Sequence, residues 1–136
     1  MININYWSVL VAAVSNMIIG SVWYSPILFG KKWMKLMGKS KEDMEREKKG
    51  VDKLYLMMFV GALVTAYVMA HFINYVSAYD AWGGAQLGIW IWLGFVMTIN
   101  LGAVLFEKRP TGLYWINNFY YLVSLTLMGI ILAVWR

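Results

Sequence analysis

The chain has 136 residues, of which 61% are hydrophobic and only 14% are charged. A soluble domain of this length cannot bury so large a share of apolar side chains, so the composition excludes an ordinary water-soluble fold and favours an integral membrane protein. The formal net charge is +5, but the basic residues gather beside apolar segments, which is typical of membrane proteins and argues against nucleic-acid binding.

Four uncharged apolar segments are each long enough to cross a bilayer, which requires about 20 residues. We expect helices, because helices satisfy every backbone hydrogen bond internally, as the hydrocarbon core of a membrane requires. The sequence therefore predicts an all-α integral membrane four-helix bundle, formed by residues 1–136 as a single domain. The predicted spans cover residues 4–26, 54–76, 84–106 and 113–135, with a loop at 27–53.

The first span is expected to stay in the protein as a helix. It lacks a basic n-region before it and a small-residue cleavage site before its end, which a removable signal peptide would carry.

The loop after the first span begins with an amphipathic helical pattern. From Pro26 to Lys39, a helical projection separates an apolar face from a basic face. The apolar face holds Phe29, Trp33, Leu36 and Met37, and the basic face holds Lys31, Lys32, Lys35 and Lys39. We predict a cytoplasmic interfacial helix that binds membrane lipid, anionic in character, through Lys31, Lys32, Lys35 and Trp33.

A second, polar helix is predicted to lead into the second span. Ser40 and Asp43 have the spacing of a capping box, and the charges that follow form helical ion pairs. We interpret this charged stretch as a solvated face, and the alternative is a docking surface for a protein partner.

Lys and Arg are distributed unequally between the two sides of the predicted bundle. Nine lie between spans one and two, and Lys108 and Arg109 lie between spans three and four, against Arg136 alone on the other side. Because basic loops stay in the cytoplasm, this asymmetry predicts that both loops are cytoplasmic and both termini outside. The predicted location is the plasma membrane, that is, the bacterial inner membrane, in a multi-pass arrangement.

Every span carries small residues at four-residue spacing, which let helix backbones approach closely in lipid. The rows are Ser8, Ala12, Asn16 and Gly20; Ala62, Ala66 and Ala70; Gly84 and Gly88, followed by Gly94, Thr98 and Gly102; and Gly129 and Ala133. We therefore expect a compact bundle. Span three has two rows, and we interpret one of them as a surface for a homo-oligomer.

Polar side chains within the spans are the candidates for a ligand site. These candidates are Asn16, Asn100, Asn117, Ser21, Ser25 and Glu107. By the helical rise per residue, Asn16 lies near the bilayer centre, whereas Asn100, Asn117 and Asn118 lie toward the cytoplasmic side. Together they predict an inward-facing polar pocket for a small-molecule or ion ligand. The alternative is that the asparagines join helices by hydrogen bonds and that Glu107 pairs with its basic neighbours.

Machinery for catalysis is not evident in the sequence. The absence of cysteine excludes a disulfide, a thiolate metal site and a thiol nucleophile. The only histidine, His71, lacks acidic partners for a metal, and no serine triad or glycine-rich phosphate loop occurs. We therefore expect no enzyme activity, no metal and no cofactor.

One sequence element resembles a known family. The stretch Trp23-Tyr-Ser-Pro-Ile-Leu-Phe-Gly-Lys-Lys-Trp33 is similar to the bacterial and fungal membrane proteins grouped as domain of unknown function family 1761. The stretch Leu105-Phe-Glu-Lys-Arg-Pro110 and the run Ile116-Asn-Asn also resemble that family. The resemblance covers nearly the whole chain and implies a four-helix membrane fold, but it implies no activity. The basic stretch from Lys39 to Lys53 departs from the usual loop of the family.

Two classes of function follow from these observations. The preferred one is an oligomeric transporter or channel-like protein, which requires a water-accessible path lined by the amides. The alternative is a non-catalytic membrane module that binds anionic lipid or a protein partner, which requires only a tight bundle and the basic helix. A membrane enzyme is the third choice.

Overall fold

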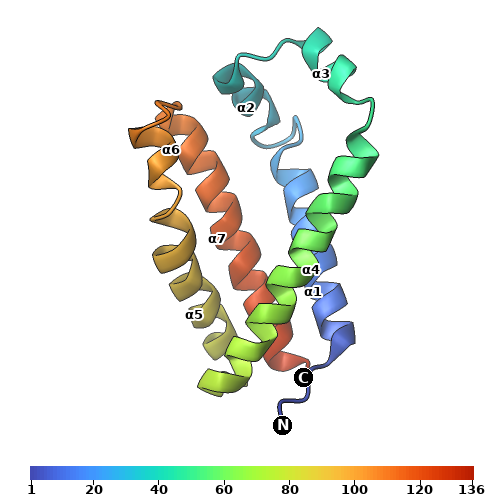
Figure 1. Cartoon of the computed structure of the whole chain (residues 1–136), viewed down its shortest axis with the longest axis vertical. Helices are drawn as coiled ribbons and strands as arrows, with labels where there is room; N and C mark the ends of the chain where they lie inside the picture. Colours follow the sequence, from blue (N-terminus) through green and yellow to red (C-terminus); the bar gives the residue numbers. More distant parts are fainter.

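The structure, a computed structural model, describes residues 1–136 and is helical except for the first five residues and the connections between helices (Figure 1). Three helices are long: α1 (Tyr6–Trp23), α4 (Val51–Val76) and α7 (Thr111–Val134). A fourth long segment is built from α5 (Ala81–Ile91), the π-helix η1 (Trp92–Met97) and the short α6 (Leu101–Leu105). Two short helices, α2 (Gly30–Met37) and α3 (Lys41–Glu47), connect α1 to α4. The four long segments are apolar enough to cross a membrane, which confirms the predicted all-α fold.

Helix α7 is the central helix of the molecule. It packs against α5, α1 and α4, and α1 also packs along α4. Figure 1 shows the long segments converging where both termini lie, with α4 leaning away from α5 and α7 toward the opposite end. We call the end with both termini the terminal end, and the end with α2, α3 and the turn at 106–110 the basic end.

In the terminal half, α5 and α7 are in close backbone contact. A Cβ atom added at Gly84 would collide with the carbonyl oxygen of Gly129, and one added at Gly88 would collide with that of Leu125. Around them lie the buried side chains of Met69, Ile73, Met128 and Leu132, together with Ala12, Ala66 and Ala70. The small residues therefore allow the close approach of helices that their spacing predicts.

The third long segment is not one continuous α-helix, contrary to the expectation from its uninterrupted apolar sequence. Six residues form η1, and residues 98–100 form a turn before α6. Two hydrogen bonds hold this region to α7: Tyr114 Oη donates to Met97 O, and Trp92 Nε1 donates to Asn118 O, both at 2.7 Å. Such wide turns are rare in α-helices and are frequent at functional sites.

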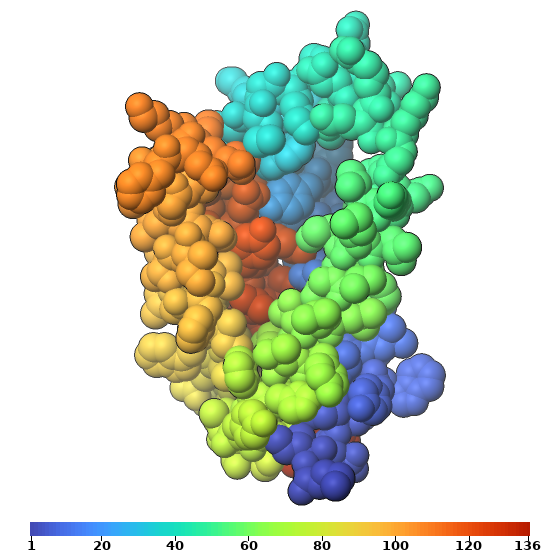
Figure 2. Space-filling view, in the orientation of Figure 1, coloured from blue at the N-terminus to red at the C-terminus, as the bar shows by residue number.

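The part of α4 nearest the basic end stands apart from the other helices. Every side chain from Leu54 to Met58 is more than half exposed, on all sides of the helix. A helix packed against a bundle would bury at least one stripe of side chains. Figure 2 shows the resulting hollow between this part of α4 and the segment α5–α6, with α7 at its floor.

The connection at the basic end differs in detail from its prediction. The helix α2 begins at Gly30 instead of Pro26, because the chain first folds back so tightly that a Cβ at Gly30 would lie 2.5 Å from Tyr24 O. The apolar face of α2 reaches α7, where Leu36 Cδ1 lies 3.1 Å from the position that a Cβ at Gly112 would take. The capping box of Ser40 and Asp43 is present at the start of α3, as predicted. The position of α2 on a membrane surface stays a prediction.

Candidate functional site

Three cavities with shared lining residues lie in the basic half of the molecule, and two of them are lined by the detached part of α4. Their volumes are about 420 Å³ between α4, η1 and α7, about 270 Å³ between α1, α4 and α7, and about 150 Å³ between α6 and α7. Tyr121 of α7 lines all three. We therefore treat them as one site, the basic-half cleft, of which Figure 2 shows the opening between α4 and α5–α6.

Asn16 joins α1 to α7 at the wall of this cleft. Its Oδ1 accepts hydrogen bonds from Tyr120 Oη at 2.9 Å and from Ser124 Oγ. The Tyr120 hydroxyl also lies 3.2 Å from the backbone carbonyl oxygen of Asn16. Because both donors use the carbonyl side of the Asn16 amide, its Nδ2 is left without a partner in the protein.

Asn100 lies in the turn after η1 and reaches α7. Its Nδ2 donates to Asn118 Oδ1 at 3.3 Å, and Asn118 Nδ2 in turn donates to Tyr114 O at 2.7 Å. Asn118 is only 1% exposed, and its amide has a bond on both sides. Asn100 Oδ1 therefore has no partner in the protein, and the buried Asn118 holds the other side of the Asn100 amide.

Asn117 connects the beginning of α7 to the end of α1. Its Oδ1 accepts from Tyr24 Oη at 2.6 Å, and beside it Trp23 Nε1 donates to Ile116 O at 3.0 Å. The Trp23–Pro26 element and the Ile116–Asn118 run, on which the family resemblance rests, thus contact each other directly. The Nδ2 of Asn117 has no partner in the protein.

The three asparagines predicted to form one site share a cleft but not a hydrogen bond. Asn16 and Asn100 line the 420 Å³ cavity, and Asn100 and Asn117 line the 150 Å³ cavity. Each amide is held by a different partner: Asn16 by Tyr120 and Ser124, Asn100 by Asn118, and Asn117 by Tyr24.

The remaining candidates contribute less to the cleft. Ser21 Oγ donates to Met17 O at 2.9 Å, and Ser25 Oγ donates to Val22 O at 2.6 Å, so both hydroxyls bond within their own helix or its end. Ser21 still lines the 270 Å³ cavity. Glu107 is exposed, and its Oε2 lies 3.1 Å from Arg109 Nε, which agrees with the interpretation of an ion pair between neighbours.

Several residues of the cleft were not selected from the sequence. Tyr24, Tyr120 and Tyr121 line it, and Arg109 is its only charged lining residue. In the sequence, a tyrosine near the end of a span, such as Tyr24, is indistinguishable from an aromatic belt residue, and deeper tyrosines, such as Tyr120 and Tyr121, are indistinguishable from packing residues. In the sequence, Arg109 is one of several basic residues in the predicted cytoplasmic loops. Its place in the lining of a cavity is evident only from the structure.

The basic residues of α2 lie on the surface, whereas its tryptophan is partly buried. Lys31, Lys32 and Lys35 are exposed. The Trp33 ring packs edge-on against Tyr24 at 6.1 Å, and Lys39 Nζ lies 5.2 Å from its centre. Trp33 therefore contacts the protein and is not free to face lipid with its whole side chain.

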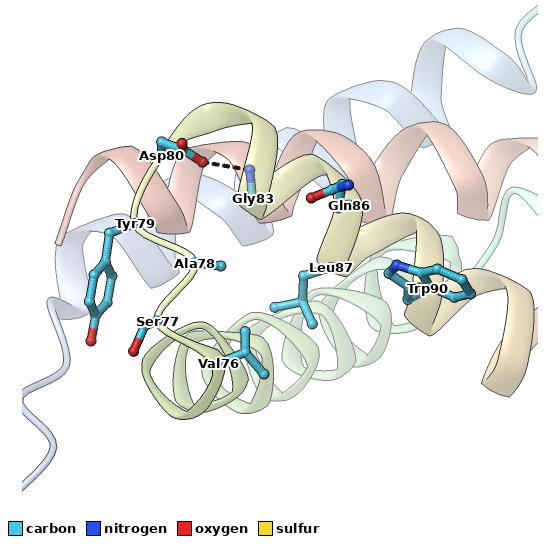
Figure 3. Close-up of a pocket in the computed structure, with 9 residues that line it drawn as sticks. All are labelled: Val76, Ser77, Ala78, Tyr79, Asp80, Gly83, Gln86, Leu87 and Trp90. Carbon is cyan, nitrogen blue, oxygen red and sulfur yellow. Dashed lines mark hydrogen bonds between the residues drawn. The ribbon is translucent and has the colours of Figure 1, made fainter.

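A cavity larger than these three lies at the terminal end, but it offers fewer free polar groups to a ligand. Figure 3 shows this depression of about 580 Å³ between the end of α4 and α5, with Gln86, Leu87 and Trp90 along one side. Its one carboxylate, Asp80, accepts from Gly83 N at 2.6 Å and so caps α5. Because that charge is used within the fold, we place the candidate site at the basic-half cleft.

Comparison with known proteins agrees with the resemblance seen in the sequence. The family model described as protein of unknown function (DUF1761) matches residues 7–133. The chain belongs to this family. The match spans nearly the whole DUF1761 chain and includes both elements that meet at Tyr24 and Asn117. No curated protein and no solved structure matches the chain.

Proposed function

We propose that this DUF1761 protein is a small membrane transporter that works as an oligomer and binds its ligand in the basic-half cleft, with the basic end in the cytoplasm. The observation that carries the proposal is a cleft with polar side chains in the basic half of a bundle whose other half holds α5 against α7 in backbone contact at Gly84 and Gly88. This is the arrangement of a carrier open to one side.

Unused hydrogen-bonding groups in the cleft support ligand binding. The Nδ2 atoms of Asn16 and Asn117 and the Oδ1 atom of Asn100 have no partner in the protein, although each amide is held in place by its other end. An amide group left unpaired in hydrocarbon costs several kcal/mol, so water or a ligand has to satisfy these groups. Asparagines that served only to join helices would use both sides of the amide, as Asn118 does.

The interrupted third segment supports transport. In many transporters, helices broken near the middle of the membrane form the binding site, because irregular backbone is tolerated only where it lines a cavity. Here η1 and the turn at 98–100 lie against the cleft, and Val96 and Asn100 line it.

Thiol labelling tests the proposal, and the chain is suited to it because it has no cysteine. Ala103 lines the polar end of the cleft, so we expect A103C to react with a membrane-impermeant thiol reagent added at the cytoplasmic side. Two controls are V64C, on an exposed face of α4 outside the cleft, and A70C in the core. Both should stay unlabelled, because a thiol needs water to ionise. Failure of A103C to react would contradict the proposal.

The same experiment separates transport from the second candidate function, a non-catalytic module that binds anionic lipid. The exposed Lys31, Lys32 and Lys35 of α2 favour that alternative. A carrier alternates between its two sides, so A103C should also react, more slowly, with reagent added outside. Strictly one-sided labelling would favour the module.

Self-association of the proposed transporter has its own support. The second small-residue row of the third segment is open, since a Cβ at Gly94 or at Gly102 would meet no atom within 4 Å. Close packing of helices in lipid uses such faces. We expect G94C to form disulfide-linked dimers in membranes under mild oxidation, and V64C to form fewer.

A further inference from the structure

The basic-half cleft opens sideways, and this limits what can enter it. One cavity lies between α4 and the segment η1–α7, and a second lies between α4 and α1. The half of α4 between them is exposed on all sides, as Leu54 at 58% and Met57 at 62% show. In a bilayer, both openings would face lipid, and a ligand that arrives by this route has to be soluble in the membrane.

The walls of the cleft divide into an apolar part and a polar part. The 420 Å³ cavity is lined mainly by apolar side chains, including Met57, Met58, Phe95 and Met128. Methionine side chains are flexible and fit irregular apolar shapes such as an acyl chain. The 150 Å³ cavity, nearer the basic end, contains Asn100, Asn117 and Arg109. An amphiphile would fit these two parts with its polar head group in the 150 Å³ cavity and its apolar chain in the 420 Å³ cavity.

The charge in the polar part of the cleft favours a ligand whose head group is negatively charged. Arg109 is the only charged residue that lines the cleft, and no carboxylate lines it. Its Nε is paired with Glu107 at 3.1 Å, which leaves the two terminal nitrogens of the guanidinium unpaired. A guanidinium presents paired donors that fit a phosphate, and the free Nδ2 of Asn117 adds another donor.

We infer that the basic-half cleft binds one anionic phospholipid from the adjacent leaflet, with its phosphate at Arg109 and Asn117 and an acyl chain along Met57, Met58 and Met128. The inference rests on the proposed function and names the ligand class of that site. The exposed lysines of α2 would enrich anionic lipid beside the opening.

Native mass spectrometry of the full chain tests this inference with two lipids of matched acyl chains. The protein is exposed to an equimolar mixture of phosphatidylglycerol and phosphatidylcholine. We expect one retained lipid, with phosphatidylglycerol preferred by about fivefold or more, since one basic residue at the head group contributes on this scale. R109Q should lose the preference. K108Q, which removes the neighbouring charge outside the cleft, should keep it.

A second pair of variants tests the position of the acyl chain. M58W should fill the cleft and reduce retention of phosphatidylglycerol, whereas V64W, outside the cleft on the same helix, should leave it unchanged. Equal retention of the two lipids would overturn the inference, as would equal effects of R109Q and K108Q. Displacement of the lipid by inorganic phosphate would also overturn it, because the site would then recognise phosphate alone.

Labelling of A103C keeps the two proposals distinguishable. If A103C reacts as expected but anionic lipid is not preferred, the ligand class is wrong and the proposed function stands. If A103C does not react and no lipid is retained, both are wrong.

Discussion

Tyr24 at the end of α1 donates its phenolic hydrogen to Asn117 Oδ1 in α7 at 2.6 Å. The two residues are 93 positions apart in the sequence. Beside this bond, Trp23 Nε1 donates to Ile116 O, so a pair of contacts ties the first long helix to the last at the basic end. The most distinctive family elements are therefore parts of one interface at the edge of the cleft.

We predict that Y24F destabilises the protein by about 1 kcal/mol, the usual contribution of a side-chain hydrogen bond between membrane helices. The measurement is unfolding in mixed micelles with increasing sodium dodecyl sulfate. Y55F is the matched control, because Tyr55 is 54% exposed and makes no hydrogen bond through its hydroxyl.

A double-mutant cycle checks that the loss comes from the bond to Asn117. N117L alone should cost about 1 kcal/mol, and Y24F combined with N117L should cost no more than N117L alone. Fully additive losses would show that the two side chains act independently.

We predict that G88A is strongly destabilising and G102A is close to neutral. A Cβ at Gly88 collides with the backbone of α7 at Leu125, whereas a Cβ at Gly102 meets open space. Overpacking of this kind costs about 1–3 kcal/mol. The thermal midpoint of the purified protein should fall clearly for G88A only, and similar midpoints for both variants would contradict the packing described for α5 and α7.

The topology prediction rests on the unequal distribution of Lys and Arg. Ser40 precedes α3 at the basic end, and Ser77 follows α4 at the terminal end. In intact cells, S77C should react with an impermeant thiol reagent, and S40C should react only after the membrane is opened. Reaction of both in intact cells would refute the predicted orientation.

The capping box of α3 predicts a pH dependence. The Ser40 backbone N–H donates to Asp43 Oδ2 at 3.0 Å, and this bond holds the pKa of Asp43 below its usual range, with a smaller contribution from the Ser40 side chain. A carboxyl group with a depressed pKa stabilises the helix above the pKa of the unfolded chain, and the stabilisation is lost as the pH falls through the folded pKa. Carbon-detected NMR titration should find this low pKa and a partial rise in S40A. An identical pKa in S40A would contradict it.

Local patterns in the sequence predicted much of the fold. Apolar length predicted the four long segments to within a few residues, as for α4, expected from 54 and found from Val51. Four-residue spacing predicted the contact surface at Gly84 and Gly88, and the Ser40 cap was also anticipated. Each of these signals lies within a few turns of one helix.

The candidate site depended on features that local patterns do not carry. The sequence does not predict that the basic half of α4 stands apart from the bundle. A membrane-spanning helix is apolar on every side, whether a given side faces lipid or another helix. The bond of Tyr24 to Asn117 joins distant positions, and a tyrosine near a membrane surface has the same composition signal in a belt as in a site. The asparagines were identified, but their partners were not.

The π-helix η1 changes the direction in which the side chains after it point from the third segment. An uninterrupted α-helix that faces α7 with Gly84 and Gly88 would turn Phe95 and Thr98 to the same side, by its period of 3.6 residues. In the structure, Phe95 and Thr98 are exposed, and Asn100 meets Asn118 instead. Removing one residue between Trp92 and Met97 would rotate the following segment by about 100° and carry the Asn100 amide out of the cleft. The position of the Asn100 amide in the cleft therefore depends on the number of residues in η1 as much as on which residues they are.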